Sequence, residues 1–121
     1  MSVERYQDLV VWQRAMQLVK ETYKLTKRLP KDETYALSDQ MRRSAVSIPS
    51  NIAEGFERQS KKEYVHFLSI AKGSKAELQT QLQICVEIGY LDIVDIGEAM
   101  ILSEEVSKML SVMIRKLTPD T

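Results

Sequence analysis

Apolar residues recur at alternating spacings of three and four along the chain, which indicates helices that each bury one face. The pattern predicts a first helix over residues 8–29 and a second over residues 33–58. Pro30 ends the first because it biases Leu29 away from the helical region, and Asp32 is the expected N-cap of the second. The first apolar stripe comprises Leu9, Trp12, Met16, Val19, Tyr23 and Thr26. The second comprises Leu37, Met41, Ala45, Ile48, Ile52 and Phe56.

Two further helices complete the pattern, over residues 61–88 and 93–117. Ser60 and Glu63 have the spacing of a capping box, and Gly89 is the expected C-terminal stop of the third helix. Asp92 or Asp95 is the expected N-cap of the fourth. The third apolar stripe comprises Tyr64, Phe67, Leu68, Ala71, Leu78, Leu82 and Cys85. The fourth comprises Ile96, Ala99, Ser103, Val106, Leu110, Met113 and Leu117.

Short links between amphipathic helices imply antiparallel neighbours. The sequence therefore predicts an all-α fold, an antiparallel up-down-up-down four-helix bundle that forms a single domain over residues 1–121. Pro49 lies inside the second helix, where proline removes one amide and clashes with the carbonyl four residues earlier, so we expect a kink or a break there. Gly73 and Ser74 lie inside the third helix, where glycine is costly, so we expect a close contact between helices there.

The composition fits a globular domain and narrows the classes of function. The chain has 121 residues, of which 44% are hydrophobic and 28% charged, and its 17 basic residues balance 17 acidic ones. Zero net charge argues against a nonspecific polyanion binder. The single cysteine excludes an internal disulfide, and no apolar stretch reaches the length of a membrane span. We expect a cytoplasmic protein that does not contact membranes.

Glu63 and His66 form the Glu-x-x-His pair that di-iron bundles use, because residues three apart on a helix can both reach an interior metal. Such a site needs the motif twice with two further carboxylates, and His66 is the single histidine. Cys85 is 19 residues from His66 on the same predicted helix. That separation is about 28 Å at 1.5 Å per residue, which is too far for a Cys-His pair. We therefore expect no catalytic, cofactor-binding or metal-binding residues and no cofactor. The alternative is a small metal-binding or enzymatic bundle that uses Glu63 and His66.

The predicted second helix carries a second stripe, which is polar. A solvated helix face is usually rich in lysine and glutamate, whereas serine and asparagine favour local alternatives to helix. The stripe therefore predicts a polar contact surface, which could include pairing of Arg43 with Glu54 between subunits. An ordinary solvated face is the alternative. The polar stripe comprises Gln40, Arg43, Ser47, Asn51, Glu54 and Arg58.

Charge is distributed unevenly along the chain. Residues 1–75 hold 14 Lys/Arg and 9 Asp/Glu, a balance of +5, whereas residues 76–121 hold 3 and 8, a balance of −5. Phosphate contacts depend on local charge, so the basic residues of the first part are candidate nucleic-acid contacts. Compensation of the basic first helix by an acidic neighbouring fourth helix is the alternative. The candidates are Lys24, Lys27, Arg28, Lys31, Arg42, Lys61 and Lys62, near Arg43 and Arg58.

Several segments together resemble the four-helix-bundle proteins encoded by intervening sequences within large-subunit (23S) ribosomal RNA genes. The most specific is the string from Arg42 to Gly55, Arg-Arg-x-x-x-Ser-Ile-Pro-x-Asn-Ile-Ala-Glu-Gly. The others are Asp8-Leu-Val-Val-Trp12-Gln13, Leu29-Pro30, Phe67-Leu68 and Ala71-Lys-Gly73-Ser74. That family is in turn similar to the accessory proteins of diversity-generating retroelements, which form pentameric barrels and associate with nucleic acid and reverse transcriptase.

The resemblance implies a homo-oligomer, most simply a pentamer, with an RNA- or DNA-associated role, and it supplies no reaction. The neutral charge balance differs from the strongly basic retroelement proteins, so we expect nucleic-acid binding to be weak and to fade with salt. The expected function is that of a non-enzymatic interaction or nucleic-acid-associated accessory protein.

Overall fold

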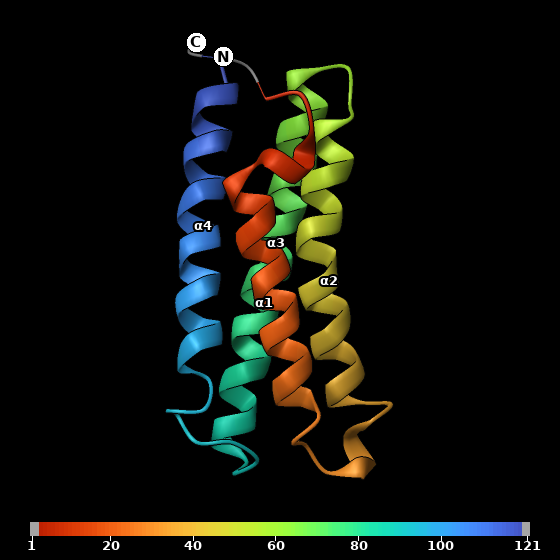
Figure 1. Ribbon diagram of the computed structural model, residues 1–121, viewed down its shortest axis with the longest axis vertical. Coiled ribbons are helices and arrows are strands. Elements are labelled where there is room, and N and C mark those ends of the chain that lie inside the picture. Colours follow the sequence, from red (N-terminus) through yellow and green to blue (C-terminus); the bar gives the residue numbers. More distant parts are fainter. Residues whose placement is uncertain (1–2, 120–121) are drawn as a thin grey trace.

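A computed structural model describes residues 3–119 and contains four long helices (Figure 1). They are α1 (Val10–Thr26), α2 (Leu37–Phe56), α3 (Lys61–Glu87) and α4 (Gly97–Leu117), with short 3-10 turns at Tyr6–Asp8 and Lys31–Glu33. Each helix packs against two others, in the cyclic order α1, α2, α3, α4. The links alternate between the two ends of the bundle, which is consistent with an up-down-up-down order. The predicted all-α fold is confirmed.

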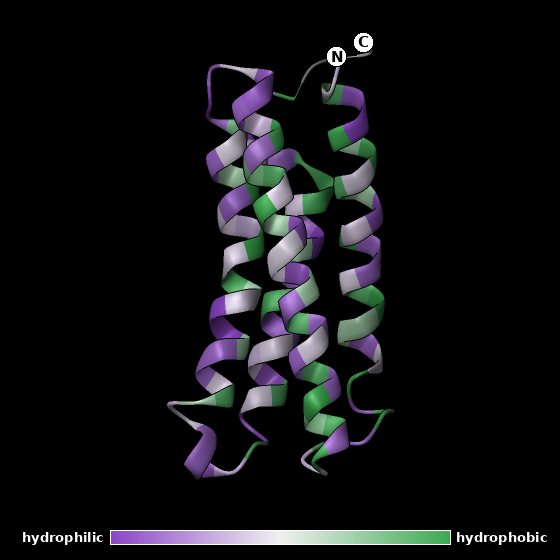
Figure 2. Cartoon of the chain, turned by 180° about the vertical axis from the view of Figure 1, so that it is seen from behind, coloured by the Kyte–Doolittle hydropathy of each residue, from purple (hydrophilic) through white to green (hydrophobic). Residues whose placement is uncertain are grey.

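The core runs along the axis between the helices, and its members come largely from the predicted stripes of α2, α3 and α4. Figure 2 shows hydrophobic and hydrophilic residues alternating along every helix, as a core on one side of each helix requires. Full burial of one leucine or isoleucine side chain stabilises the fold by about 1.5–3 kcal/mol. The buried members of these stripes are Met41, Ala45, Ile48, Ile52, Leu68, Ala71, Leu78, Leu82, Cys85, Ile96, Ala99, Ser103, Val106 and Leu110.

Of the stripe predicted to face inward on α1, only Thr26 is buried. Leu9, Trp12, Met16 and Val19 are half-buried, and Tyr23 is 38% exposed. The buried face lies about 100° around the helix, the angle of one residue. Its polar member Thr22 donates its hydroxyl to the Leu18 carbonyl at 2.8 Å, which satisfies the group inside the core. That face comprises Val11, Ala15, Leu18, Thr22, Leu25 and Thr26.

The ends of α1 and α2 also differ from the prediction. α1 ends at Thr26 because the next turn tightens, with the Arg28 amide bonded to the Leu25 carbonyl at 3.0 Å. Asp32 is not the N-cap of α2, since it lies in the preceding 3-10 turn and the helix begins at Leu37. Glu33 substitutes for it by accepting a hydrogen bond from the Leu37 amide at 3.3 Å.

Both predicted ends of α3 are confirmed. The Ser60 hydroxyl accepts a hydrogen bond from the Glu63 amide at 3.1 Å. Gly89 has φ +86°, and the Tyr90 amide reaches back to the Cys85 carbonyl at 2.8 Å, as in a Schellman motif. The predicted start of α4 is wrong, because the helix begins at Gly97 and the Asp95 carboxylate instead accepts from the Asp92 amide at 2.8 Å.

Pro49 and the Gly73-Ser74 pair each depart in part from expectation. α2 continues as a helix through Pro49, so the predicted break does not occur, while a kink stays a prediction. The close helix contact expected at Gly73-Ser74 is made by Ser74, whose hydroxyl lies 2.7 Å from that of Ser47 on α2, whereas a Cβ built at Gly73 would meet open space. The glycine in close contact is Gly55, where a Cβ would come within 2.9 Å of Phe67 Cβ and 3.0 Å of Tyr64 Cδ1.

Within residues 3–119, no helix combines the length and the hydrophobicity that crossing a membrane requires.

Candidate functional site

The middle of the α2 polar stripe is used inside the chain. Ser47 and Asn51 are half-buried against α3. The hydroxyls of Ser47 and Ser74 lie 2.7 Å apart, and the Asn51 amide donates to the carbonyl and hydroxyl oxygens of Ser47 at 2.8 and 2.9 Å. Hydrogen bonds satisfy these buried groups and fix α2 against α3. Ser74 makes the close helix contact that was predicted at Gly73-Ser74, although the sequence did not identify Ser47 as its partner.

The charged residues of the polar stripe are exposed and form ion pairs within α2. Arg43 donates to the Asp39 carboxylate at 2.9 Å, and Arg58 pairs with Glu54 one helical turn away. The Arg58 guanidinium also lies over the ring of Phe67, 4.8 Å from its centroid. Arg43 and Glu54 therefore each have another partner within the chain. Their pairing between subunits stays a prediction.

A shallow polar groove of about 300 Å³ lies beside this cluster, between α2 and α3. Gln81 is buried in its wall, and its Oε1 atom has no hydrogen-bond partner among the described residues. Leaving a buried acceptor unsatisfied costs about 1–3 kcal/mol. Charges of both signs line the groove, which comprises Gln40, Arg43, Ser44, Ser47, Ser74, Glu77 and Gln81.

On the other side of α2, apolar side chains line a groove against α1. Trp12, Met16 and Val19 of α1 meet Val46 and Pro49 of α2 there, around a hollow of about 300 Å³. We call these five residues the α1–α2 apolar face. Val46 is 40% exposed, and the three α1 residues are half-buried. The apolar stripe that the sequence assigned to the core of the bundle is thus partly at the surface.

Arg42 lies next to this face and links two helices. Its Nε donates to the Thr26 hydroxyl at 2.8 Å, and its guanidinium lies over the Tyr23 ring, 4.6 Å from the centroid. The side chain is half-buried. Arg42 therefore holds α2 to α1, unlike the exposed lysines with which it was grouped.

The other basic candidates lie at opposite ends of the bundle. Lys24, Lys27, Arg28 and Lys31 lie where α1 leads into α2, whereas Lys61 and its neighbour Lys62 begin α3 at the far end. The 20 residues of α2 separate these ends by about 30 Å at 1.5 Å per residue. The structure therefore does not bring the seven predicted contacts into one surface.

The first end contains one ion pair of the kind expected under the alternative to nucleic-acid binding. Arg28 forms an ion pair with Asp95, which precedes α4, at 3.1 Å. The Asp92 amide and the Arg28 guanidinium both stabilise the carboxylate and lower the pKa of Asp95. Lys24 lies 4.0 Å from Glu21 on its own helix. Acidic partners therefore reduce the positive charge at this end.

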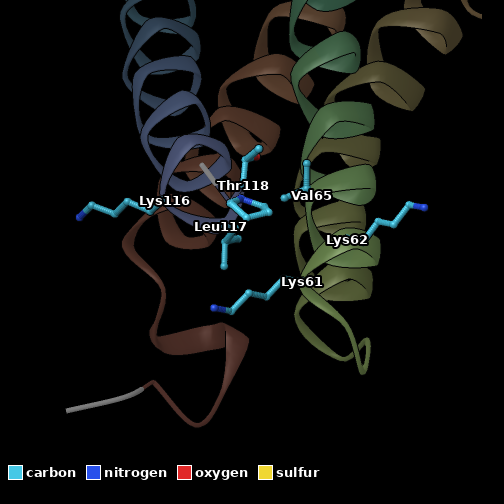
Figure 3. Close-up of a pocket in the computed structure, with 7 residues that line it drawn as sticks. Lys61, Lys62, Val65, Lys116, Leu117 and Thr118 are labelled. Atoms are coloured by element: carbon cyan, nitrogen blue, oxygen red, sulfur yellow. The ribbon is translucent and has the colours of Figure 1, made fainter. Parts of the chain in front are cut away.

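At the other end, Lys61 and Lys62 meet the C-terminal turn of α4. They line a pocket of about 460 Å³ with Lys116, Leu117 and Val65 (Figure 3). Thr118 and Pro119 complete the described lining. The sequence prediction missed Lys116 because it lies in the acidic part of the chain, and only the fold places it beside the start of α3.

Glu63 and His66 are exposed on the first turns of α3. His66 packs edge-on against Phe67, with ring centroids 5.4 Å apart. The di-iron interpretation needs both side chains to point into the bundle, and this arrangement does not occur. In the described part of the chain, no group of three or more His, Cys, Asp or Glu residues has a geometry suited to a metal ion.

Cys85 is buried on the apolar stripe of α3, as predicted, with its Sγ 3.6 Å from the sulfur of Met41. Burial raises the pKa of the thiol, and the nearby Glu33 carboxylate raises it further. The neutral thiol therefore predominates at pH 7 and packs as a small hydrophobic group.

Comparison with known proteins agrees with the resemblance seen in the sequence. The family described as 23S rRNA-intervening sequence protein matches residues 7–112. A solved structure of a protein with unknown function from the S23 ribosomal protein family of Bacteroides thetaiotaomicron VPI-5482 has a TM-score of 0.80, with 24% identity over 87% of this chain and 98% of that chain. That likeness shows the shared fold. A search of curated proteins finds no match. Because the family match covers most of its length, this chain belongs to the 23S rRNA-intervening sequence protein family.

Proposed function

We propose that this chain is a non-enzymatic, homo-oligomeric interaction protein that acts in association with ribosomal RNA intervening sequences. The observation that carries the proposal is the α1–α2 apolar face, where the half-buried Trp12, Met16 and Val19 form a helical stripe at the edge of the core. Each 100 Å² of such surface removed from water contributes about 2.5 kcal/mol. A second copy that covers this face gains that energy, and a pentamer is the oligomer that the family resemblance implies.

The oligomer is tested with Val46→Glu, which places a charge on the apolar face at a side chain that is 40% exposed. Light scattering of the wild type is expected to give a multiple of the 13.9 kDa chain mass, and the variant a smaller mass. Ile101→Glu is the matched control, because it changes a 60% exposed position on α4 in the same way. Circular dichroism checks that both variants remain helical. A wild type that runs as a monomer refutes the oligomer.

We further propose that the protein binds nucleic acid weakly through its lysines. The observation that favours this activity is the gathering of Lys61, Lys62 and Lys116 at one pocket whose described lining contains no carboxylate. Binding of a labelled RNA is expected to fall steeply between low and physiological salt, because each phosphate contact releases counterions. Fluorescence anisotropy over a salt series measures this slope, and tight binding that does not respond to salt contradicts the mechanism.

A further inference from the structure

The pocket between the start of α3 and the end of α4 combines an apolar interior with positive charge at its rim. Val65, Leu117 and Pro119 supply the apolar surface, and the charged residues in its described lining are all lysines. The α2–α3 groove differs, because Arg43 and Glu77 give it charges of both signs. A ligand for this pocket needs an apolar body and at least one negative charge.

The three lysines that line the pocket come from two helices, α3 and α4. Figure 3 shows Lys61 reaching from α3 toward α4 below Leu117, while Lys62 and Lys116 extend outward on opposite sides. Within residues 3–119, none of the three forms an ion pair. The α3 N-terminus and the α4 C-terminus have dipoles of opposite sign. Among the described residues that line the pocket, the positive charge therefore comes from the three lysines.

A nucleotide has both features that the pocket requires. Its base is a flat, largely apolar ring that proteins hold between aromatic or aliphatic side chains, and its phosphate is an anion that lysine binds. The volume of about 460 Å³ falls within the ordinary range for small-ligand sites. Bases in a duplex are stacked and paired, so only an unpaired base can enter without the cost of extrusion.

We propose that this pocket receives an unpaired base of single-stranded nucleic acid, with the adjoining phosphates on Lys61, Lys62 and Lys116. The inference rests on the proposed nucleic-acid association and names the form of the ligand and the site that binds it. The pocket selects single strands over duplexes and tolerates different bases, because its described wall is mostly aliphatic and every base has an apolar face.

The test compares three labelled ligands by fluorescence anisotropy at one low salt concentration. They are a single-stranded oligonucleotide of about a dozen nucleotides, the same strand with abasic sites, and its duplex. The intact strand is expected to bind the wild-type protein about tenfold more tightly than the abasic strand, because loss of the base removes its contact with the aliphatic wall. The duplex is also expected to bind more weakly than the intact strand.

Two double variants locate the site. Lys61→Ala with Lys116→Ala is expected to weaken single-strand binding about tenfold and to remove the preference over the abasic strand. Lys24→Ala with Lys27→Ala is the matched control, since it removes the same charge from exposed positions at the other end of the bundle. The control is expected to keep the preference. Circular dichroism verifies the fold of each variant.

Each outcome has a distinct meaning. Wild-type protein that binds none of the three ligands refutes both the nucleic-acid association and the pocket assignment. Equal binding of intact and abasic strands, or of strand and duplex, overturns the base pocket and leaves the association standing. Displacement of the strand by an acidic peptide of equal charge, at the same concentration as unlabelled strand, assigns the pocket to a protein ligand and also overturns the proposal.

Discussion

The two sides of α2 use polar and apolar residues in opposite ways. Toward α3, the Asn51 amide donates to the Ser47 hydroxyl, which lies within hydrogen-bond distance of the Ser74 hydroxyl. Toward α1, Trp12 and Met16 remain partly at the surface. Hydrogen bonds within the chain already satisfy the polar cluster, whereas half-exposed apolar side chains gain energy when a partner covers them. In this bundle the apolar side of α2 is therefore the better candidate for assembly.

The largest expected loss of stability compares the buried face of α1, which contains Leu18, with the predicted stripe, which contains Val19. Leu18→Ala empties a fully buried position and is expected to destabilise the fold by about 3 kcal/mol. Val19→Ala alters the half-buried neighbouring stripe and should cost about 1 kcal/mol or less. Urea unfolding measures both. A larger loss of stability for Val19→Ala than for Leu18→Ala would support the inward-facing stripe that the sequence predicted.

Two glycine substitutions test how closely α2 approaches α3. Gly55→Ala is expected to lose about 1–2 kcal/mol, because its Cβ meets the Cβ of Phe67 at 2.9 Å and overpacking outweighs the gain in helix propensity. Gly73→Ala is the matched control, with open space around the new Cβ, and should gain about 0.5–1 kcal/mol. Equal effects at the two positions would contradict the close contact at Gly55.

The polar cluster between α2 and α3 is tested by a double-mutant cycle. Ser47→Ala and Ser74→Ala remove the two hydroxyls that lie 2.7 Å apart, and we expect a coupling energy of about 1 kcal/mol. The sum of the single losses should exceed the loss in the double variant, because each single change strands the other hydroxyl. Additive losses would mean that the two groups do not interact.

The smallest effect concerns Asp95, whose pKa is lowered by the Asp92 amide and by Arg28. A carboxyl with a lower pKa in the folded state stabilises the fold above its unfolded pKa, and this contribution disappears as pH falls through the folded pKa. Asp95→Asn should therefore lower stability at neutral pH and flatten its decline in acid. Parallel stability curves for wild type and variant would show that the ion pair contributes nothing.

Some features that depend on neighbouring residues, such as both ends of α3, were predictable from the sequence. Ser60 caps α3 and Gly89 ends it because the necessary atoms lie within a few residues. The inward face of α2 was also clear, since its other face is polar. The buried face of α1 was not predicted, because small residues such as Ala15 and Thr22 carry too weak a hydropathy signal to mark it.

Features that depend on distant residues were not predictable in this way. The partner of Ser47 is 27 residues away on another helix. The pocket at Lys61 requires Lys116, which only the packing of α3 against α4 brings near. The seven basic candidates were grouped by their charge alone. Because each helix is tens of ångströms long, the fold places them at both ends of the bundle.

The buried thiol of Cys85 makes the chain a natural reporter of its own opening. A thiol reagent reacts with the thiolate and needs access to it, and Cys85 provides neither while α3 is packed. The single cysteine means that every labelled molecule has exposed this one position. The labelling rate therefore measures how often the core near Met41 opens, and any partner that clamps the helices together slows it.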